Sequence, residues 1–456
     1  MKEFSIKDLA RIIKAEPAGD ITGSITGVSI DSRTVKPGDC FFAVVGDNFD
    51  GHNYVGQAIA KGAVCAVVSK DVGGGPILKV ADTVKALGDF ARHYRQQAGY
   101  KVVAITGSVG KTTTRQIAHH ILSQHFHVSQ AQKNFNNQIG LPLTLLDADE
   151  ETQIVVAELG TNHPGEIAYL TRIALPDVAV ITSVYPAHLE GFGDLQTIIE
   201  EKLSISEGLQ SDGAFIINGD FDRLVSACKA KGSKTSRLYT FGKSDSCDIQ
   251  ARNINRTGLG SSFTIDGTQL YSPLPGLGNV DNVLAAWAVC SQFGLSLDDF
   301  AKALKIQPTV SMRAELLQIG TLTILNDSYN ANPASMTNAL DILTNIDSTG
   351  KRRLVFICGD MAELGSQTEH LHTELGPSIA GAGVQLLITV GKFAKIAAES
   401  AKSRAEHDLR IKCFDDTLSA CNNLKDYIKD YDIILVKGSR TAGLETAVEK
   451  LKQLFS

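Results

Sequence analysis

The chain has 456 residues, of which 43% are hydrophobic and 21% charged, and it carries a formal net charge of -6 with a pI of about 6.0. At roughly 100–200 residues per domain, this indicates a globular protein of several domains, and it excludes the basic surface that a nucleic-acid-binding protein needs. No apolar run approaches the roughly 20 residues that cross a bilayer, and the first residues lack an apolar signal core, so we predict a cytoplasmic protein without membrane insertion.

The first block, residues 1–82, mixes short strands with one helix. Apolar runs predict strands at 41–45 and 63–68, and the pattern at 54–61 predicts a helix between them. The run Gly73-Gly74-Gly75-Pro76 predicts a turn just before the block ends. This block is therefore predicted to be a small N-terminal α/β domain.

The second block, residues 83–309, opens with a helical pattern at 83–97 and continues with an apolar strand at 102–105. Further strands are predicted at 154–157, 178–181 and 214–217, with helical patterns between them. Such alternation is typical of a parallel sheet with helices on both faces. The polar stretch 245–268 predicts short antiparallel strands, and a predicted helix at 280–293 closes this central, P-loop-type domain.

The third block, residues 310–456, repeats the alternation, with strands predicted at 322–325, 354–358, 386–390 and 433–436. This predicts a C-terminal Rossmann-like domain. Asp327 and Asp360 follow the first two strands, where doubly wound sheets bind ligands. Spacing alone leaves open which of these acids contacts a ligand.

A glycine-rich loop follows the strand at 102–105 and precedes a helical pattern. It consists of Gly107, Ser108, Val109, Gly110, Lys111, Thr112 and Thr113. Strand, loop and helix in this order predict a phosphate cradle for ATP, because loop amides and a helix N-terminus attract anions. Lys111 can reach the β- and γ-phosphates, and the Thr112 hydroxyl can bind Mg²⁺. The usual Walker A pattern has a glycine where Ile105 stands, so the alternative is a tight turn with a surface lysine.

Two further residues follow strands of the same predicted sheet. Glu158 comes directly after the strand at 154–157, which is a suitable position for a magnesium-binding acid. His188 follows the strand at 178–181 in a predicted loop. The alternatives are an ordinary surface charge for Glu158 and a structural role for His188, since a lone loop histidine is more often structural.

Several segments, in order along essentially the whole chain, together resemble the Mur ligases of bacterial cell-wall synthesis. These segments are residues 29–33, 37–39, 50–52, 106–113, 134–142, 158–160, 187–190, 201–202, 326–333, 359–365 and 437–440. The most specific are Asp327-Ser328-Tyr329-Asn330-Ala331-Asn332-Pro333 and Gly359-Asp360-Met361-Ala362-Glu363-Leu364-Gly365, which resemble the branch that adds D-alanyl-D-alanine. Val109 and Gly278 depart from the residues usual in the family.

The resemblance implies three domains that hold the UDP precursor (1–82), ATP (83–309) and the incoming dipeptide (310–456). It implies an ATP-dependent ligase that joins D-alanyl-D-alanine to UDP-N-acetylmuramoyl-tripeptide through an acyl phosphate, in the cytoplasm and as a monomer. The residues that it implies are Ser32, Arg33 and Asn137 for the substrate; Thr112, Glu158, His188 and Lys202 for Mg²⁺; Asn279 and Asn282 for adenine; and Arg313 and Asp327 for the ribose and phosphates of ATP.

The loop predicts Lys111 as a catalytic residue, and the resemblance implies Lys202 and His188 as the others. The resemblance implies that Lys202 is carbamylated, because a carbamate would supply an anionic oxygen ligand to a second Mg²⁺. From the residues alone, Lys202 is better interpreted as a cation on the surface of a helix.

Two alternatives remain open at this point. One is a ligase of the same architecture that adds a single amino acid to a muramoyl peptide, or glutamate to folate. The other is a nucleotide-binding regulator that uses the loop as a switch and turns over little ATP.

Overall fold

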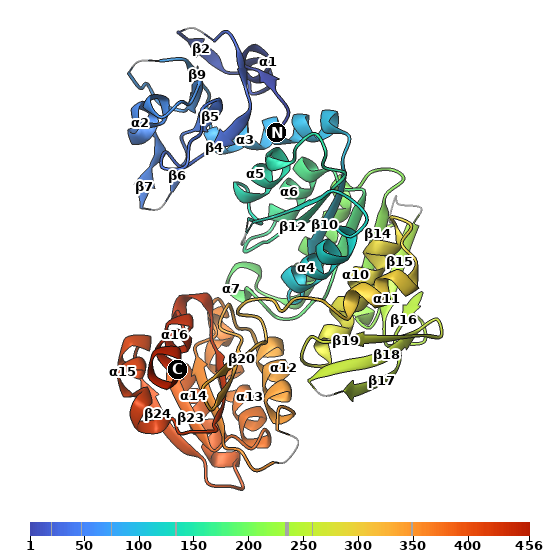
Figure 1. The fold of residues 1–456 in the computed structure, drawn as a ribbon, viewed down its shortest axis with the longest axis vertical. Helices are drawn as coiled ribbons and strands as arrows, with labels where there is room; N and C mark the ends of the chain where they lie inside the picture. The colour runs from blue at the N-terminus through green and yellow to red at the C-terminus, as the bar shows by residue number, and fades with distance from the viewer. Residues whose placement is uncertain are drawn as a thin grey trace.

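A computed structural model describes residues 1–19, 21–46, 48–73, 75–132, 135–232, 237–257, 259–347 and 350–456. The chain forms three α/β units, and the central one contacts the other two (Figure 1). No helix among the described ranges is both long and apolar enough to cross a membrane. The three-domain α/β fold predicted from the sequence is confirmed, whereas the boundaries at 82/83 and 309/310 stay predictions.

The N-terminal unit contains a five-stranded mixed sheet in the order β2-β9-β8-β5-β4. Its strands are β2 (Glu16–Ala18), β4 (Gly27–Ser29), β5 (Asp39–Phe42), β8 (Cys65–Val68) and β9 (Ile77–Lys79). The remaining elements are β1 (Phe4–Ser5), α1 (Ile6–Ile12), β3 (Ser24–Ile25), β6 (Val45–Gly46), β7 (Phe49–Asp50), the 3-10 helix η1 (Gly51–Tyr54) and α2 (Val55–Ala60).

One predicted strand of this unit has different bounds in the structure, and one predicted turn lies partly outside the described residues. The strand predicted at 41–45 instead begins at Asp39 and ends at Phe42, because the chain turns at Val44, whose carbonyl accepts the N–H of Gly51. In the turn predicted at 73–76, Gly74 lies outside the described residues. The predicted helix at 54–61 is α2, and the strand predicted at 63–68 is β8.

The central unit is built on a seven-stranded parallel sheet in the order β11-β12-β10-β13-β14-β15-β16. Its strands are β10 (Lys101–Thr106), β11 (Val128–Gln130), β12 (Ile154–Glu158), β13 (Val178–Ile181), β14 (Ala214–Asn218), β15 (Arg237–Gly242) and β16 (Ile249–Gln250). Successive residues of β10 point into two different cores: Val102 and Ala104 into one, Val103 and Ile105 into the other. A strand buried on both faces must be apolar throughout, which explains its continuous hydrophobic run.

Helices cover both faces of this sheet. One face packs against α3 (Thr83–Ala98), α5 (Gly140–Asp147), α6 (Glu166–Ala174), α8 (Leu195–Leu203) and α9 (Asp222–Lys231). The other packs against α4 (Lys111–Leu122), α10 (Gly278–Ser291) and α11 (Leu297–Leu304). The unit also contains the short helices α7 (Leu189–Phe192) and η2 (Ser204–Gly208).

The predicted antiparallel strands in the stretch 245–268 are largely confirmed. A three-stranded antiparallel sheet contains β17 (Arg252–Thr257), β18 (Gly260–Ile265) and β19 (Thr268–Ser272). Its start differs from the prediction, since β16 pairs in parallel with β15 and extends the large sheet instead.

The C-terminal unit has a six-stranded sheet in the order β20-β21-β25-β22-β23-β24, parallel except for the edge strand β20. Its strands are β20 (Glu315–Ile319), β21 (Leu322–Asn326), β22 (Leu354–Gly359), β23 (Leu386–Val390), β24 (Arg410–Phe414) and β25 (Ile433–Lys437). Its helices are α12 (Pro333–Thr344), η3 (Gly365–Gln367), α13 (Thr368–Gly381), α14 (Ala394–Arg404), α15 (Thr417–Tyr427), η4 (Arg440–Ala442) and α16 (Glu445–Phe455).

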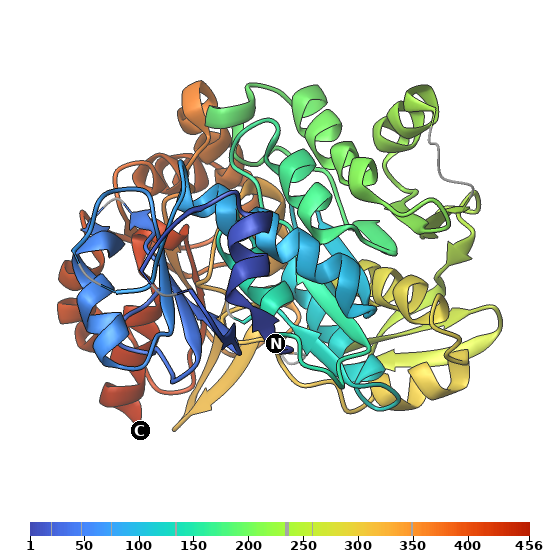
Figure 2. The same cartoon turned by 90° about the horizontal axis from the view of Figure 1, so that it is seen from above.

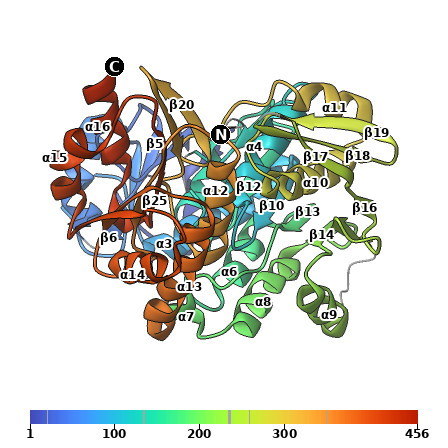
Figure 3. The ribbon, with the colours of Figure 1, turned by 90° about the horizontal axis from the view of Figure 1, so that it is seen from below.

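The central and C-terminal units meet on both sides of the segment that joins them. Seen from above and from below, α7 of the central unit lies beside the start of α13 (Figures 2 and 3), and α7 contacts η3 there. On the other side, Arg256 of β17 forms an ion pair with Asp341 of α12. The carboxyl ends of the two parallel sheets thereby face a common space.

Candidate active site

The predicted phosphate loop connects β10 to α4, as the sequence indicated. Gly107 and Gly110 have φ values of 150° and 90°, in the region that favours glycine. Each glycine is also closely packed: a Cβ on Gly107 would lie 2.0 Å from Thr182 Oγ1, and one on Gly110 would lie 2.1 Å from Asn282 Oδ1. Backbone conformation and space therefore both require glycine at these two positions.

The loop is held by the segment that follows β13. Ser108 N–H donates to the carbonyl of Ser183 (2.9 Å), and Val109 N–H donates to Ser183 Oγ (3.0 Å). These two amides are therefore already bonded within the protein. The amides of residues 110–113, at the start of α4, have no acceptor within the described part of the chain. They are the unpaired donors that make a helix N-terminus an anion site.

Gly110 offers a direct test of this loop. We expect Gly110→Ala to lower the free energy of unfolding by about 1–2 kcal/mol through backbone strain, and to weaken Mg·ADP binding because Asn282 must move. Gly165→Ala is a matched control: Gly165 precedes α6 with nearly the same backbone angles, and a Cβ there meets nothing within 4 Å. Urea unfolding and calorimetric titration with Mg·ADP measure both effects. Equal nucleotide affinity in the two variants would contradict the assigned position of the loop.

Thr112 and Glu158 form a pair of oxygen donors beside the loop. The Thr112 hydroxyl donates to Glu158 Oε2 (2.7 Å), and the Asn136 amide donates to Oε1 (3.0 Å). Burial raises the pKa of Glu158, but attraction to Lys111 and Arg313 and these two hydrogen bonds outweigh it, so that the net shift is downward. Glu158 is thus held ionised although only 4% of its surface is exposed.

This pair fits a magnesium site. Mg²⁺ prefers oxygen ligands and is often held by one or two protein groups together with water and substrate phosphates. Consistent with such a sparse site, the described residues contain no cluster of three or more His, Cys, Asp or Glu side chains that could hold a metal. Hydroxyl and carboxylate oxygens at the start of α4 therefore suit Mg²⁺ that arrives with a nucleotide.

Two lysines add positive charge to the same space. Lys111 Nζ donates to the carbonyl of Gly107 (2.8 Å) across the loop. Burial lowers the pKa of Lys111, while Glu158 opposes this shift and Arg313 adds to it. Lys202, near the end of α8, is only 3% exposed, and its ammonium group has no hydrogen-bond or ion-pair partner within the described ranges. Burial, with repulsion from Lys111, lowers the pKa of Lys202 to about 7, against the weaker pull of Glu201. This environment corrects the alternative that Lys202 is a surface cation.

The C-terminal unit supplies the opposite wall of the site. Arg313 lies over the ring of Tyr329, with Cζ 4.2 Å from the ring centroid. Asp327 accepts from Lys437 Nζ (2.6 Å) and from the N–H of Ala314 (3.0 Å), so both of its oxygens are engaged. Asp327 is therefore fixed at the end of β21 next to the joining segment.

Asp360 has a different role. Its carboxylate accepts the N–H groups of Lys392, Phe393 and Ala394 at the start of α14. Of the two strand-end acids that spacing could not separate, Asp360 is thus the one occupied in holding the fold, whereas Asp327 faces the cavity.

The remaining predicted residues of the central unit lie on α10, at the start of α5 and just before α7. Asn279 and Asn282 are hydrogen-bonded to each other on α10 (2.8 Å), next to the loop. The Asn137 side chain accepts the N–H of Gly140 (2.9 Å) at the start of α5. Asn134, in the same predicted segment, lies outside the described residues. His188 Nδ1 is hydrogen-bonded to Glu363 of the C-terminal unit. The hydrogen bond from His188 is the first cause of the lowered pKa of Glu363.

These side chains surround a single cavity of about 710 Å³ between the central and C-terminal units. Its lining includes Gly107, Ser108, Val109, Gly110, Lys111, Thr113, Asn137, Glu158, His188, Lys202, Asn279, Asn282, Arg313 and Asp327. The structure thus brings together residues that the sequence analysis proposed separately. Thr112 reaches the site through its hydrogen bond to Glu158.

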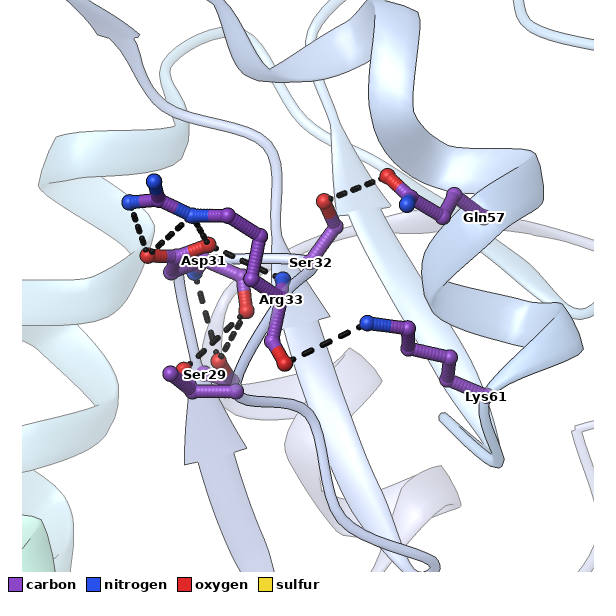
Figure 4. Close-up of polar contacts among 7 residues, drawn as sticks. Ser29, Asp31, Ser32, Arg33, Gln57 and Lys61 are labelled. Atoms are coloured by element: carbon purple, nitrogen blue, oxygen red, sulfur yellow. Dashed lines mark hydrogen bonds and ion pairs between the residues drawn. The ribbon is translucent and has the colours of Figure 1, made fainter.

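Ser32 and Arg33 lie in the N-terminal unit and do not line this cavity. Figure 4 shows their polar contacts. Ser32 Oγ donates to Gln57 of α2 (2.8 Å), and Arg33 forms an exposed ion pair with Asp31. Lys61 Nζ donates to the carbonyl of Arg33 (3.2 Å). Their predicted contact with the UDP precursor stays a prediction.

The sequence analysis assigned no individual role to four residues of the site. Asn136 and Arg115 flank Glu158, and Arg115 Nε, 3.9 Å from Glu158 Oε2, has no hydrogen-bond acceptor among the described atoms. Tyr329 and Glu363 position Arg313 and His188. Asn136, Tyr329 and Glu363 fall within the segments that carried the family resemblance. Arg115 had one available signal, its place one helical turn after the loop lysine.

Comparison with known proteins establishes the family. Residues 24–95 match the catalytic domain of the Mur ligase family, residues 105–290 the Mur ligase middle domain, and residues 312–440 the Mur ligase glutamate ligase domain. Together with full-length relatives of more than 30% identity, these matches show that the chain belongs to the Mur ligase family. The resemblance inferred from the motifs is confirmed.

Several relatives of high coverage come from one branch of the family. The UDP-N-acetylmuramoyl-tripeptide–D-alanyl-D-alanine ligases of Bacillus subtilis (strain 168) and Escherichia coli (strain K12) are each 36% identical, over 99% of both chains. A crystal structure of MurF from Acinetobacter baumannii superposes with a TM-score of 0.88 at 31% identity, over 99% of both chains. MurF ligase from Thermotoga maritima, solved in complex with ADP, superposes with a TM-score of 0.81 at 26% identity, over 94% of this chain and 97% of that chain.

Proposed function

We propose that this chain is an ATP-dependent ligase that joins D-alanyl-D-alanine to UDP-N-acetylmuramoyl-tripeptide in peptidoglycan precursor synthesis. The observation that carries the proposal is the cavity between two domains, where a phosphate loop, an ionised Glu158 and a buried Lys202 face Arg313. The two relatives that are 36% identical over 99% of the chain carry this activity in their names. The reaction consumes ATP, so we expect it in the cytoplasm, and we keep the monomer as the expected state.

The chemistry follows from the poor reactivity of a carboxylate toward an amine. The terminal carboxylate of the tripeptide attacks the γ-phosphate of ATP, which releases ADP and gives an acyl phosphate. The neutral amine of D-alanyl-D-alanine then attacks the acyl carbonyl, and phosphate leaves as the amide bond forms. Positioning and positive charge lower the barrier of the first step, because an anion must approach a polyanion.

The residues of the cavity are assigned to these tasks as follows. The free amides at the start of α4 hold the phosphates, and Lys111 exchanges its bond to the Gly107 carbonyl for the β- and γ-phosphate oxygens. Asn279 and Asn282 take the adenine side of the cavity, and Arg313 and Asp327 take the ribose and phosphates. Asn137 lies on the same wall as Glu158 and is assigned to the muramoyl substrate.

Thr112 and Glu158 would hold Mg²⁺, with His188 and a carbamylated Lys202 as further ligands. When bound, Mg²⁺ would neutralise charge on the phosphates. Lys202 suits the carbamate because a buried amine with a pKa of about 7 is about half neutral at pH 7 and largely neutral above it, and only the neutral amine captures CO₂. Ser32 and Arg33 of the N-terminal domain are assigned to the UDP end of the precursor.

A substrate panel tests the proposal. We expect release of ADP and phosphate, with matching formation of the amide product, only when UDP-N-acetylmuramoyl-tripeptide and D-alanyl-D-alanine are both present. Single amino acids in place of the dipeptide, and folate with glutamate, serve as controls. Faster turnover with any of these controls would favour another ligase of this architecture. Slow ATP hydrolysis that ignores all muramoyl peptides would favour a nucleotide-binding regulator.

A further inference from the structure

Glu363 of the C-terminal domain binds the turn around His188 in two ways. Its carboxylate accepts from His188 Nδ1, and its main-chain carbonyl accepts the N–H of Glu190 (3.1 Å). The contact is close on both sides, since a Cβ on Gly365 would lie 3.2 Å from Glu190 Cα. Glu363 of the C-terminal domain therefore holds the turn around His188 of the central domain through both its side chain and its main chain.

Both partners have an unusual backbone conformation. His188 and Glu363 have φ values of 55° and 61°, in the left-handed region that residues with a side chain rarely adopt. Such conformations persist where the surrounding structure holds them, and they cluster at functional sites. Here each residue is turned so that its side chain meets the other across the domain boundary.

The hydrogen bond also decides which nitrogen of His188 is available. Nδ1 is engaged by Glu363, while Nε2 has no hydrogen-bond partner among the residues that the structure describes. A carboxylate on one ring nitrogen fixes the ring orientation and makes the other nitrogen a better ligand. His188 lines the same cavity as Glu158, so Nε2 is the His188 nitrogen that is left for a group bound there.

We propose that Glu363 is a positioning residue that orients His188 toward Mg²⁺ only when the C-terminal domain is docked, so that domain closure completes the metal site. The proposal rests on the proposed function, because it uses the assignment of His188 as a magnesium ligand. It adds a residue from the third domain that acts through His188.

Rotation between two domains is usually absorbed by a few residues of a loop that joins them. In the joining segment here, Met312 and Ala314 on either side of Arg313 have φ values of 56° and 49°. The second contact between these domains, Arg256 with Asp341, lies away from His188 and provides a matched control.

Manganese binding measures the effect without catalysis. Mn²⁺ replaces Mg²⁺ and is titrated into the full-length protein with ADP, with free Mn²⁺ followed by electron paramagnetic resonance. We expect Glu363→Ala to weaken Mn²⁺ binding about 10–100-fold, the usual effect of losing a partner of a metal-bound histidine. The main-chain bond to Glu190 is retained in this variant, so loss of docking is not expected. Glu363→Gln should stay close to wild type, because its amide oxygen still accepts from Nδ1–H.

Two further comparisons complete the test. Asp341→Ala should bind Mn²⁺ like wild type, and Glu363→Ala should cause no additional loss in a His188→Ala background. The proposal is overturned if Glu363→Ala binds Mn²⁺ normally or more tightly, if Glu363→Gln is as weak as Glu363→Ala, if Asp341→Ala has the same effect, or if the loss persists without His188. If wild type binds Mn²⁺ and ADP with this pattern but forms no amide, only the proposed reaction fails.

Discussion

Replacing Lys111 with alanine should lower kcat for amide formation by about 10²–10³-fold, the usual loss for a single electrostatic donor in a water-excluded site. The ammonium of Lys111 is the cation of the phosphate loop. It donates to the carbonyl of Gly107, and we expect a phosphate oxygen to replace this carbonyl as its acceptor when nucleotide binds. Because the charge on the transferring phosphoryl group is stabilised most in the transition state, kcat should fall more than the affinity for Mg·ATP. Steady-state phosphate release, with calorimetry for nucleotide binding, measures both.

Lys101→Ala is the control for this experiment. Lys101 lies at the other end of β10, where its exposed ammonium pairs with Asp177. Exposed ion pairs contribute little to stability, about 0–1 kcal/mol, so this variant should keep its turnover. A folded Lys111→Ala variant with turnover near wild type would refute the assignment of the loop.

Much of the fold could be predicted because its strands are buried on both faces. β10, β12, β13 and β14 each contain a continuous run of four apolar residues, and each was located from that run. A strand with exposed residues was missed. In β24 (Arg410–Phe414) every residue is exposed or half-buried, so its sequence carries charged residues without a clear period.

Some residues of the site could be predicted from the sequence, and others depend on tertiary packing. Glu158 and Asp327, at the ends of apolar strands, both line the shared cavity, as expected where parallel strands end at one edge. The same pattern could not set Asp360 apart, whose carboxylate instead holds the start of α14. The environment of Lys202 could not be predicted, since its burial depends on α8 packing against the central sheet. Nor could the bond between His188 and Glu363, which joins residues 175 positions apart in different domains.

The burial of Lys202 should affect both the stability of the folded protein and the proposed chemistry of the site. A buried amine without a counter-ion destabilises the folded state, because desolvation disfavours its charged form. The pKa of Lys202 in the folded protein, about 7, lies below the ordinary lysine pKa of 10.5, so this destabilisation is complete below pH 7 and declines as pH rises toward 10.5. Lys202→Met should therefore raise the free energy of unfolding, most strongly at or below neutral pH, as urea unfolding at several pH values can measure.

The same substitution should remove activity, because methionine cannot capture CO₂. We expect Lys202→Met and Lys202→Ala to lose about 10²-fold or more in turnover. Short carboxylates such as acetate should restore part of the turnover only in Lys202→Ala, whose smaller side chain leaves room.

For wild type depleted of CO₂, reactivation by bicarbonate should be faster at pH 8 than at pH 6, since the neutral fraction of the Lys202 amine falls from about nine-tenths at pH 8 to about one-tenth at pH 6. A folded, inactive Lys202→Ala variant that no carboxylate restores would argue against the carbamate. It would leave Lys202 as a buried cation that acts directly on the phosphates, and reactivation would then not depend on bicarbonate at either pH.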